Sequence, residues 1–278
     1  MTRAGAWPPS PDALPVPVVD NHAHLEYPAG DTPRTVAQSL DAAAAVGVDR
    51  VVQIGCELDS ARWTAKAVEE FPAMLGGVAL HPNEVPKLKT EGAYDAAFAE
   101  ISEIALGERI RVVGETGLDF YRTGPEGHVA QIAAFRDHIA LAKELGLVLQ
   151  IHDRDAHADV IDVLMRDGAP AATVFHCFSG DAGMAKLCVQ RGWYLSFAGP
   201  VTFTSAHGLR AALAVTPLSQ VLVETDAPFL TPHPHRGAPN GPYLVPITMR
   251  TIADVTGTEL AEACAAVSRN SEDLYGPW

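Results

Sequence analysis

Eight short apolar segments recur along the chain, and helical periodicity follows most of them. These patterns predict strands at Val18–Leu25, Arg50–Gly55, Leu75–Pro82, Val112–Asp119, Leu147–Asp153, Thr173–Phe178, Tyr194–Pro200 and Val221–Pro228. The helices predicted between them are Thr32–Val46, Ser60–Phe71, Tyr94–Leu106, His128–Leu145, Ala156–Asp167, Ala182–Arg191 and Ser205–Val215. Strands that alternate with helices over about 250 residues predict a (β/α)8 TIM barrel, an α/β fold. The structural rival, a doubly wound open sheet, carries a G-x-G-x-x-G signature after its first strand, and this sequence has none there.

The remaining segments fit a single domain with additions at both ends. Residues 1–17 are rich in proline, and we expect them to form a loosely held leader. The barrel domain is then expected at residues 18–278. A long polar loop follows the last predicted strand, and two extra C-terminal helices are predicted at Val245–Thr256 and Thr258–Ser268.

Residues that favour helix ends mark two of the predicted helices. Asp31 or Thr32 is expected to cap the first helix at its N-terminus. Gly146 follows a predicted helix end, where a left-handed residue is favoured. We therefore expect these positions to set the boundaries of the two helices.

Composition and charge exclude several classes of protein. The net charge of −14 argues against non-specific wrapping of duplex nucleic acid, although a pocket for one phosphate or a chain end stays open. No apolar run approaches the ~20 residues that span a bilayer, and prolines replace the apolar region of a secretory signal. Four cysteines without a C-x-x-C pair fit reduced thiols in a cytoplasmic protein. The oligomeric state is left open between a monomer and a small homo-oligomer.

Histidines and carboxylates stand at the C-terminal ends of several predicted strands, which is where barrel enzymes build their sites. Side chains alternate along a strand, so His22 and His24 are expected on the same side, one step apart. We predict that four imidazoles and two carboxylates meet there and bind two divalent cations, with room for water. The predicted ligands are His22, His24, Glu115, His152, His176 and Asp226. Nitrogen-rich ligation favours Zn, Mn, Fe or Ni over Mg.

Other residues near these strand ends are candidates for binding substrate. His81 is expected to contact substrate more readily than metal. Arg154 carries a positive charge to the same region, and Arg236 and Asn240 lie in the long loop after the last predicted strand. Glu224, two residues before Asp226, is expected to lie deeper and to support the site.

Other catalytic chemistries find little support in the sequence. It lacks a G-x-S-x-G elbow, a G-x-x-x-x-G-K-[ST] loop and an H-E-x-x-H helix. Cys177 follows His176 on a predicted strand and is expected to face the opposite side, which argues against a thiol–imidazole nucleophile.

The motifs that carry these residues resemble the TatD family of metal-dependent deoxyribonucleases. The resemblance runs from Asp20-Asn21-His22-Ala23-His24 through Gly114-Glu115-Thr116-Gly117-Leu118-Asp119 and His176-Cys177-Phe178-Ser179-Gly180 to Glu224-Thr225-Asp226-Ala227-Pro228, and it continues into Asn240-Gly241-Pro242-Tyr243. It implies a TIM barrel in which His22, His24 and Asp226 hold one metal ion. It further implies that His152 and His176 complete a second ion and that Glu115 bridges the two. Family members are described as Mg-dependent, and they often crystallise with Zn, so the metal stays open.

The function that this resemblance implies is hydrolysis of a phosphodiester by a metal-activated water, in an exonuclease-like reaction at single-stranded or frayed DNA ends. Asp226 and Glu115 are the predicted catalytic residues, Asp226 as the general base. The alternative is that the same two-metal scaffold hydrolyses an ester, lactone, amide or aminoacyl-tRNA bond. A non-catalytic binding protein is the third possibility, but every predicted ligand is present. No membrane partner is expected.

Overall fold

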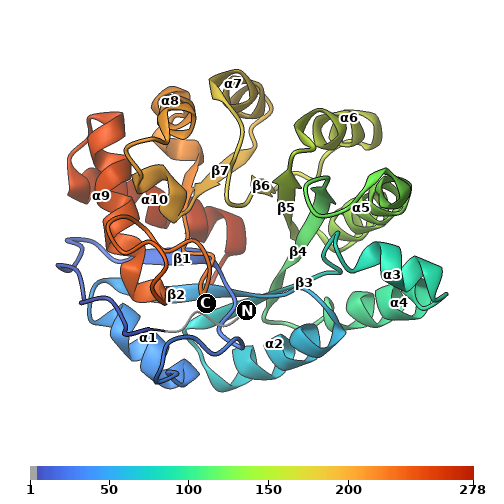
Figure 1. Ribbon diagram of the computed structural model, residues 1–278, viewed down its shortest axis with the longest axis horizontal. Coiled ribbons are helices and arrows are strands. Elements are labelled where there is room, and N and C mark those ends of the chain that lie inside the picture. Colours follow the sequence, from blue (N-terminus) through green and yellow to red (C-terminus); the bar gives the residue numbers. More distant parts are fainter. Residues whose placement is uncertain (1–4) are drawn as a thin grey trace. The chain divides into compact units, whose positions relative to one another are not determined.

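The eight predicted strands form one parallel sheet in a computed structural model that describes residues 5–278 (Figure 1). The strands follow one another in the sheet in sequence order. They are β1 Val18–Ala23, β2 Val48–Gly55, β3 Met74–Val78, β4 Ile110–Asp119, β5 Val148–Arg154, β6 Thr173–Phe175, β7 Tyr194–Phe197 and β8 Val221–Val223. Helices connect successive strands, so this is the (β/α)8 TIM-barrel fold that the sequence predicts.

Helices occupy nearly all of the segments where helical periodicity predicts them. They are α1 Val36–Ala44, α2 Leu58–Glu70, α3 Val85–Thr90, α4 Tyr94–Ile104, α5 Pro125–Leu145, α6 His157–Asp167, α7 Ala182–Gln190, α8 His207–Val215, α9 Val245–Thr256 and α10 Leu260–Tyr275. Short 3₁₀ segments lie at η1 Gly199–Thr202, η2 Leu218–Gln220 and η3 Pro242–Leu244. The prediction misses α3 and ends α10 seven residues early. Among residues 5–278, no helix combines the length and hydropathy that a bilayer crossing requires.

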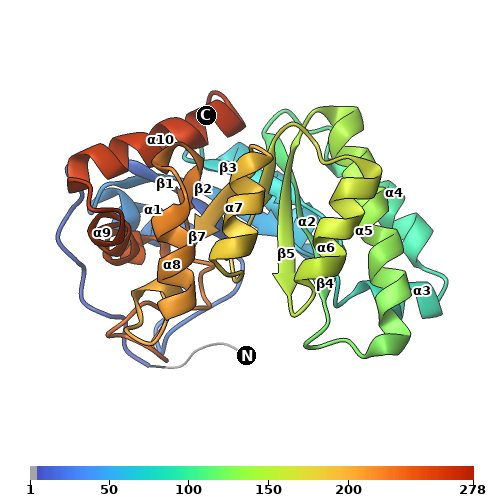
Figure 2. The ribbon, with the colours of Figure 1, turned by 90° about the horizontal axis from the view of Figure 1, so that it is seen from above.

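Internal contacts divide the chain into two compact units. The first unit comprises residues up to 53, residues 71–74 and residues 180–278. Within it, α7 and α8 lie side by side (Figure 2), and α10 packs on β1 and β8. Asn21 on β1 joins these elements, because its amide donates to the carbonyl of Val223 at 2.8 Å and accepts from Ser271 of α10 at 3.0 Å.

The second unit comprises residues 54–70 and 75–179. Its centre is the parallel pair β4 and β5, against which α5 packs. Gly117 pairs with His152 in this ladder. Gly117 has φ +137, and a Cβ atom there would lie 2.1 Å from the carbonyl oxygen of His152. Only glycine permits this conformation and this close approach, which together place His152 beside the end of β4.

Residues 5–17 are tied to the first unit, so the expectation of a loosely held leader is wrong for them. The Tyr243 hydroxyl donates to the Pro8 carbonyl at 2.8 Å, and Arg250 donates to the Asp12 carbonyl at 2.9 Å. The Leu14 amide donates to the Val46 carbonyl at 3.0 Å. Proline removes a backbone donor but leaves the carbonyl oxygen, and side chains from η3 and α9 use these acceptors. The rest of the predicted leader, residues 1–4, lies outside the described residues.

The two predicted helix boundaries have different outcomes. Gly146 ends α5 in the left-handed conformation with φ 66, as predicted. The cap of α1 is Thr35 in place of Asp31 or Thr32, and Thr35 and Gln38 form a reciprocal capping box. Asp31 instead accepts a hydrogen bond from the backbone of Gly5 at 2.8 Å.

Candidate metal centre

Two histidines and an aspartate lie together in the first unit. The Nε2 atoms of His22 and His24 are 3.2 Å apart. Asp226 Oδ1 lies 3.4 Å from His24 Nε2 and 3.8 Å from His22 Nε2. Both histidines are buried, whereas 14% of the Asp226 side chain is exposed. The expectation that the two imidazoles share one side is confirmed.

Backbone hydrogen bonds between the end of β1 and the segment after β8 hold this histidine–aspartate cluster. The Asp226 amide donates to the His22 carbonyl at 2.9 Å, and the His24 amide donates to the Ala227 carbonyl at 2.8 Å. Asp226 has φ 54, in the left-handed region that L-residues rarely adopt. Such conformations cost free energy and are concentrated at functional sites.

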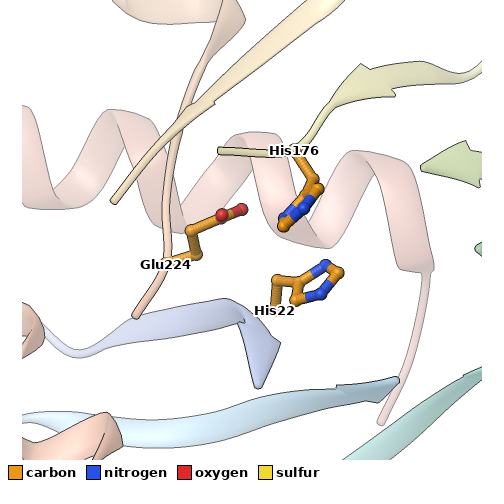
Figure 3. Close-up of side chains that lie close together, drawn as sticks. All are labelled: His22, His176 and Glu224. Carbon is orange, nitrogen blue, oxygen red and sulfur yellow. The ribbon is translucent and has the colours of Figure 1, made fainter. Parts of the chain in front are cut away.

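Two buried carboxylates, Asp20 and Glu224, lie next to the histidine–aspartate cluster of the first unit. Asp20, which carries no predicted role, accepts hydrogen bonds from the amides of Thr225 at 2.9 Å and His22 at 3.3 Å. Burial raises the pKa of Asp20 to about 7, although the bonds from Thr225 oppose the shift. Glu224 is fully buried, and one of its oxygens lies within 4.8 Å of a ring nitrogen of His22 (Figure 3). Glu224 is therefore close enough to act as a ligand itself.

In the second unit, histidines surround the carboxylate of Glu115. His176 Nε2 lies 2.7 Å and His152 Nδ1 3.2 Å from Oε2 of Glu115. His81 Nε2 lies 3.5 Å and Cys56 Sγ 3.4 Å from the other oxygen, Oε1. His176 directly follows β6 and is also drawn in Figure 3.

Asp119 belongs to this second cluster, although no site role is predicted for it from the sequence. Its Oδ2 lies 3.2 Å from His152 Nε2 and accepts from the Asn83 amide group at 3.0 Å. Asp119 and Glu115 are four residues apart on β4, so strand alternation places them on one face. The even spacing from Glu115 is the sequence feature that could have identified Asp119 as part of the site. No sequence feature pointed to Asn83, because it reaches the site from the segment before α3.

Burial and charge shift the titration of the second cluster in opposite directions. Burial alone would raise the pKa of Glu115, but His176, His81 and His152 outweigh it and hold that pKa well below its usual range. Burial opposes protonation of His152, yet hydrogen bonds to Asp119 and Glu115 raise the pKa of His152 to about 9. The pKa of Asp119 is lowered despite burial, chiefly by the bond from His152. Without a cation, the cluster is thus an ion-pair network with an anionic Glu115.

His81 differs from the other histidines of this cluster. Burial lowers the pKa of His81 to about 3, so the ring is neutral near pH 7. Its Nδ1 accepts a hydrogen bond from the backbone amide of Asn83 at 3.0 Å, which leaves the ring proton on Nε2. With its proton on Nε2, the ring can donate to an anionic oxygen. His81, Glu115 and His152 also offer donor atoms within 4.8 Å of one another, so His81 is close enough to ligate a metal as well.

The donor sets of both units fit divalent cations. In the first set the donor atoms lie 3.2–3.8 Å from one another. In the second set each imidazole nitrogen lies 2.7–3.2 Å from the Glu115 carboxylate, so each histidine can share an ion with that carboxylate. Placing the ionised groups so close in a buried position is costly unless an opposite charge or a metal compensates it. The structure thus groups three of the six predicted ligands in each unit.

The other predicted substrate residues have different surroundings. The Arg154 guanidinium lies 3.9 Å from the ring centroid of Tyr121, and Arg236 is exposed with its guanidinium 5.4 Å from the ring of Phe203. Asn240 does not fit the role of a substrate contact. Its amide group donates to the carbonyls of Thr225 and Phe229, and its oxygen accepts from the Gly241 amide. These bonds occupy both donors of a buried side chain.

Cys177 does not lie on a strand, because β6 ends at Phe175. It has φ 42, so strand alternation does not describe which way its side chain points. Strand alternation therefore does not exclude a thiol–imidazole pair at this position, contrary to the expectation from the sequence.

Comparison with known proteins decides the family. The family described as TatD related DNase matches residues 19–276, nearly the whole chain. The chain belongs to the TatD family. It is a metal-dependent hydrolase, as the names of its similar relatives state.

Several TatD-family relatives match over almost their full length. The metal-dependent hydrolase TatD of Mycobacterium tuberculosis is 44% identical over 264 residues, which cover 93% of this chain and 98% of the relative. YabD of Bacillus subtilis is 34% identical over 257 residues, with coverage of 92% and 98%. The crystal structure of YjjV, a TatD homologue from Escherichia coli, superposes with a TM-score of 0.84 at 25% identity and covers 93% of this chain and 97% of that chain.

Proposed function

We propose that this TatD-family hydrolase is a phosphodiesterase that cleaves DNA at single-stranded or frayed ends. The observation that carries the proposal is the pair of imidazole–carboxylate clusters, one in each unit, with donor separations suited to divalent cations. The description of the matching family as TatD related DNase supports DNA as the substrate.

We propose that each cluster holds one divalent cation. His22, His24 and Asp226 would hold the first, and Glu115, His152 and His176 the second. Their nitrogen-rich donor sets favour Zn, Mn, Fe or Ni, and Mg stays a candidate because two carboxylates also contribute oxygen. When bound, such ions supply positive charge for the phosphoryl oxygens and lower the pKa of water toward neutrality.

The residues around the clusters supply the other requirements of the reaction. Asp226 has an accessible carboxylate beside His24 and would accept the proton of the attacking water as general base. The neutral His81 would donate from Nε2 to a phosphoryl oxygen. Arg154 would pair with the phosphate charge, which a lactone substrate does not carry. Arg236, exposed on the loop after β8, would bind the DNA backbone further away.

We also propose that the protein is cytoplasmic. Among the described residues, no disulfide joins any of its four cysteines, as is usual for proteins of reducing compartments.

A substrate panel tests the proposed function. Purified protein is stripped with a chelator and reloaded with Zn, Mn, Ni, Fe or Mg, and its bound metal is measured. End-labelled single-stranded DNA, a nitrophenyl phosphodiester and a series of lactones are then compared under each metal. We expect hydrolysis of the first two, with labelled products that shorten from one end. Hydrolysis of lactones alone, or none of the phosphodiesters with the metal bound, would exclude a nuclease.

A further inference from the structure

Two exposed aromatic side chains lie beside His24 in the first unit. The ring centroids of Tyr27 and Phe229 are 6.3 Å apart, and they lie 5.9 Å and 6.0 Å from the ring of His24. Tyr27 is 37% exposed and Phe229 36%, whereas His24 is 3% exposed. The described chain has six large hydrophobic residues with this degree of exposure, and these two are in contact with the same proposed metal ligand.

The backbone presents the two rings in the same way. The Tyr27 amide donates to the His24 carbonyl at 3.3 Å, and the Phe229 amide donates to the Asp226 carbonyl at 2.7 Å. Each ring thus stands three residues after a proposed ligand, at the end of a turn that begins with that ligand. The side-chain amide of Asn240 donates to the Phe229 carbonyl and so fixes the turn from Asp226 to Phe229. Exposed aromatic rings on hydrogen-bonded turns next to a buried site are well placed to contact a ligand.

We propose that Tyr27 and Phe229 form an aromatic platform on which the nucleobase next to the cleaved phosphodiester stacks. This proposal rests on the proposed function and names the part of the DNA that the first unit recognises. Aromatic side chains stack on bases without regard to their identity, because every base has a π-face. The platform therefore binds a DNA end with little sequence preference, and it needs no net positive charge from an acidic protein.

The geometry of the two rings favours stacking on the platform over insertion between them. Their planes are inclined at 60°, and a flat base between them would need about 7 Å, twice an optimal carbon–carbon contact distance. The separation of 6.3 Å with that tilt leaves too little room. The base therefore lies against one ring and meets the edge of the other, as aromatic groups prefer.

A binding experiment tests the platform without catalysis. The probe is a short single-stranded DNA with phosphorothioate linkages, which slow cleavage, and 2-aminopurine at either end, whose fluorescence falls on stacking. We expect saturable quenching by the wild type, and about ten-fold weaker binding for Tyr27→Ala and Phe229→Ala. Phe229→Leu keeps apolar volume without a π-face and should behave like Phe229→Ala, whereas Tyr27→Phe should bind like the wild type.

Val129→Ala is the matched control, because Val129 is exposed to 77% and lies on α5 in the other unit. It should leave the probe affinity unchanged. Equal affinity and quenching in Tyr27→Ala, Phe229→Ala and wild type would overturn the platform. An equal loss in Val129→Ala would also overturn it, because the loss would then not depend on the two rings.

Kinetics separate this proposal from the proposed function. Oligonucleotides that end in a normal or an abasic nucleotide are compared. We expect the wild type to show about a ten-fold higher KM for the abasic end with a similar kcat, and Phe229→Ala to raise KM for the normal end alone. Cleavage of both ends with equal KM and no quenching would refute the platform and leave the nuclease proposal standing. Quenching without cleavage of either end would support the platform and refute the nuclease proposal. The absence of both quenching and cleavage would refute both proposals.

Discussion

The Nε2 atom of His152 lies 3.2 Å from Oδ2 of Asp119, while its Nδ1 lies 3.2 Å from Oε2 of Glu115. The imidazole is therefore held between two carboxylates, one beside the proposed metal position and one behind it. A carboxylate behind a metal-binding histidine orients the ring and makes it a better ligand, and its loss lowers metal affinity by about 10–100-fold.

We therefore predict that Asp119→Ala weakens binding of the second cation by about 10–100-fold. Competition with a chromogenic chelator measures this affinity. Asp95→Ala is the control, because its carboxylate is 96% exposed and lies beside Lys89 on the surface. Equal affinities in the two variants would show that Asp119 does not orient His152 for a metal.

Removal of the imidazole itself has a larger effect. His152→Ala deletes a proposed ligand of the second cation, so bound metal should fall from two ions per chain to one. Hydrolysis should fall by at least about 100-fold, since even a supporting carboxylate contributes up to that factor. Elemental analysis and initial rates measure both quantities. His207→Ala, which removes an exposed histidine at the start of α8, should change neither. Full metal content and activity in His152→Ala would contradict the assignment.

Stability should depend on pH through a histidine that carries no catalytic role. His138 on α5 is fully buried, donates from Nδ1 to the Ala134 carbonyl at 2.7 Å and accepts the Leu80 amide at Nε2. Burial lowers the pKa of His138 to about 4, whereas a histidine in an unfolded chain has a pKa near 6.5. Between these values the unfolded chain binds a proton that the folded chain does not. The free energy of unfolding should therefore fall as the pH falls, by about 3 kcal/mol at pH 4.

Denaturant unfolding at several pH values measures this contribution. His138→Gln should be less stable than the wild type near pH 7, but its free energy of unfolding should fall less steeply from pH 6.5 toward pH 4. Curves of the two proteins that run parallel through this range would show that His138 does not resist protonation in the folded state.

We predict that Asn240 stabilises the loop after β8. Asn240→Ala removes the donor to the carbonyls of Thr225 and Phe229 in a buried position. We expect a loss of about 2 kcal/mol in the free energy of unfolding, which denaturant titration measures. A raised KM with unchanged stability would instead restore the original interpretation of Asn240 as a substrate contact.

Patterns with a local cause were read correctly from the sequence. The pairing of His22 with His24 follows from the two-residue period of a strand, and the end of α5 follows from the freedom of Gly146. The alternation of apolar strands with helices was enough to predict the (β/α)8 fold. Strands buried on both faces appear as continuous apolar runs, and helices appear as apolar residues at helical spacing, so both are visible in the sequence. Asp119 was within reach of the same argument, since it shares the parity of Glu115 on β4.

Features that depend on distant partners were not readable in this way. The chain between Gly5 and Pro17 is ordered by Tyr243 and Arg250, more than two hundred residues away. Asn240 lies in a polar loop, yet its amide is directed to backbone carbonyls instead of solvent. The short helix α3 contains Pro86 and has only six residues, too few for periodicity to reveal it.

The alternation of residue types along this chain specified its elements, its fold and the six histidines and carboxylates that could bind metal. Which neighbours those groups face was settled by long-range packing. His81 is neutral because the folded chain buries it and its Nδ1 accepts the Asn83 amide, whereas His152 without a bound cation is charged because Asp119 and Glu115 flank it. Protonation and hydrogen-bond direction depend on charges and donors a few ångströms away in space, and a one-dimensional pattern does not contain those distances.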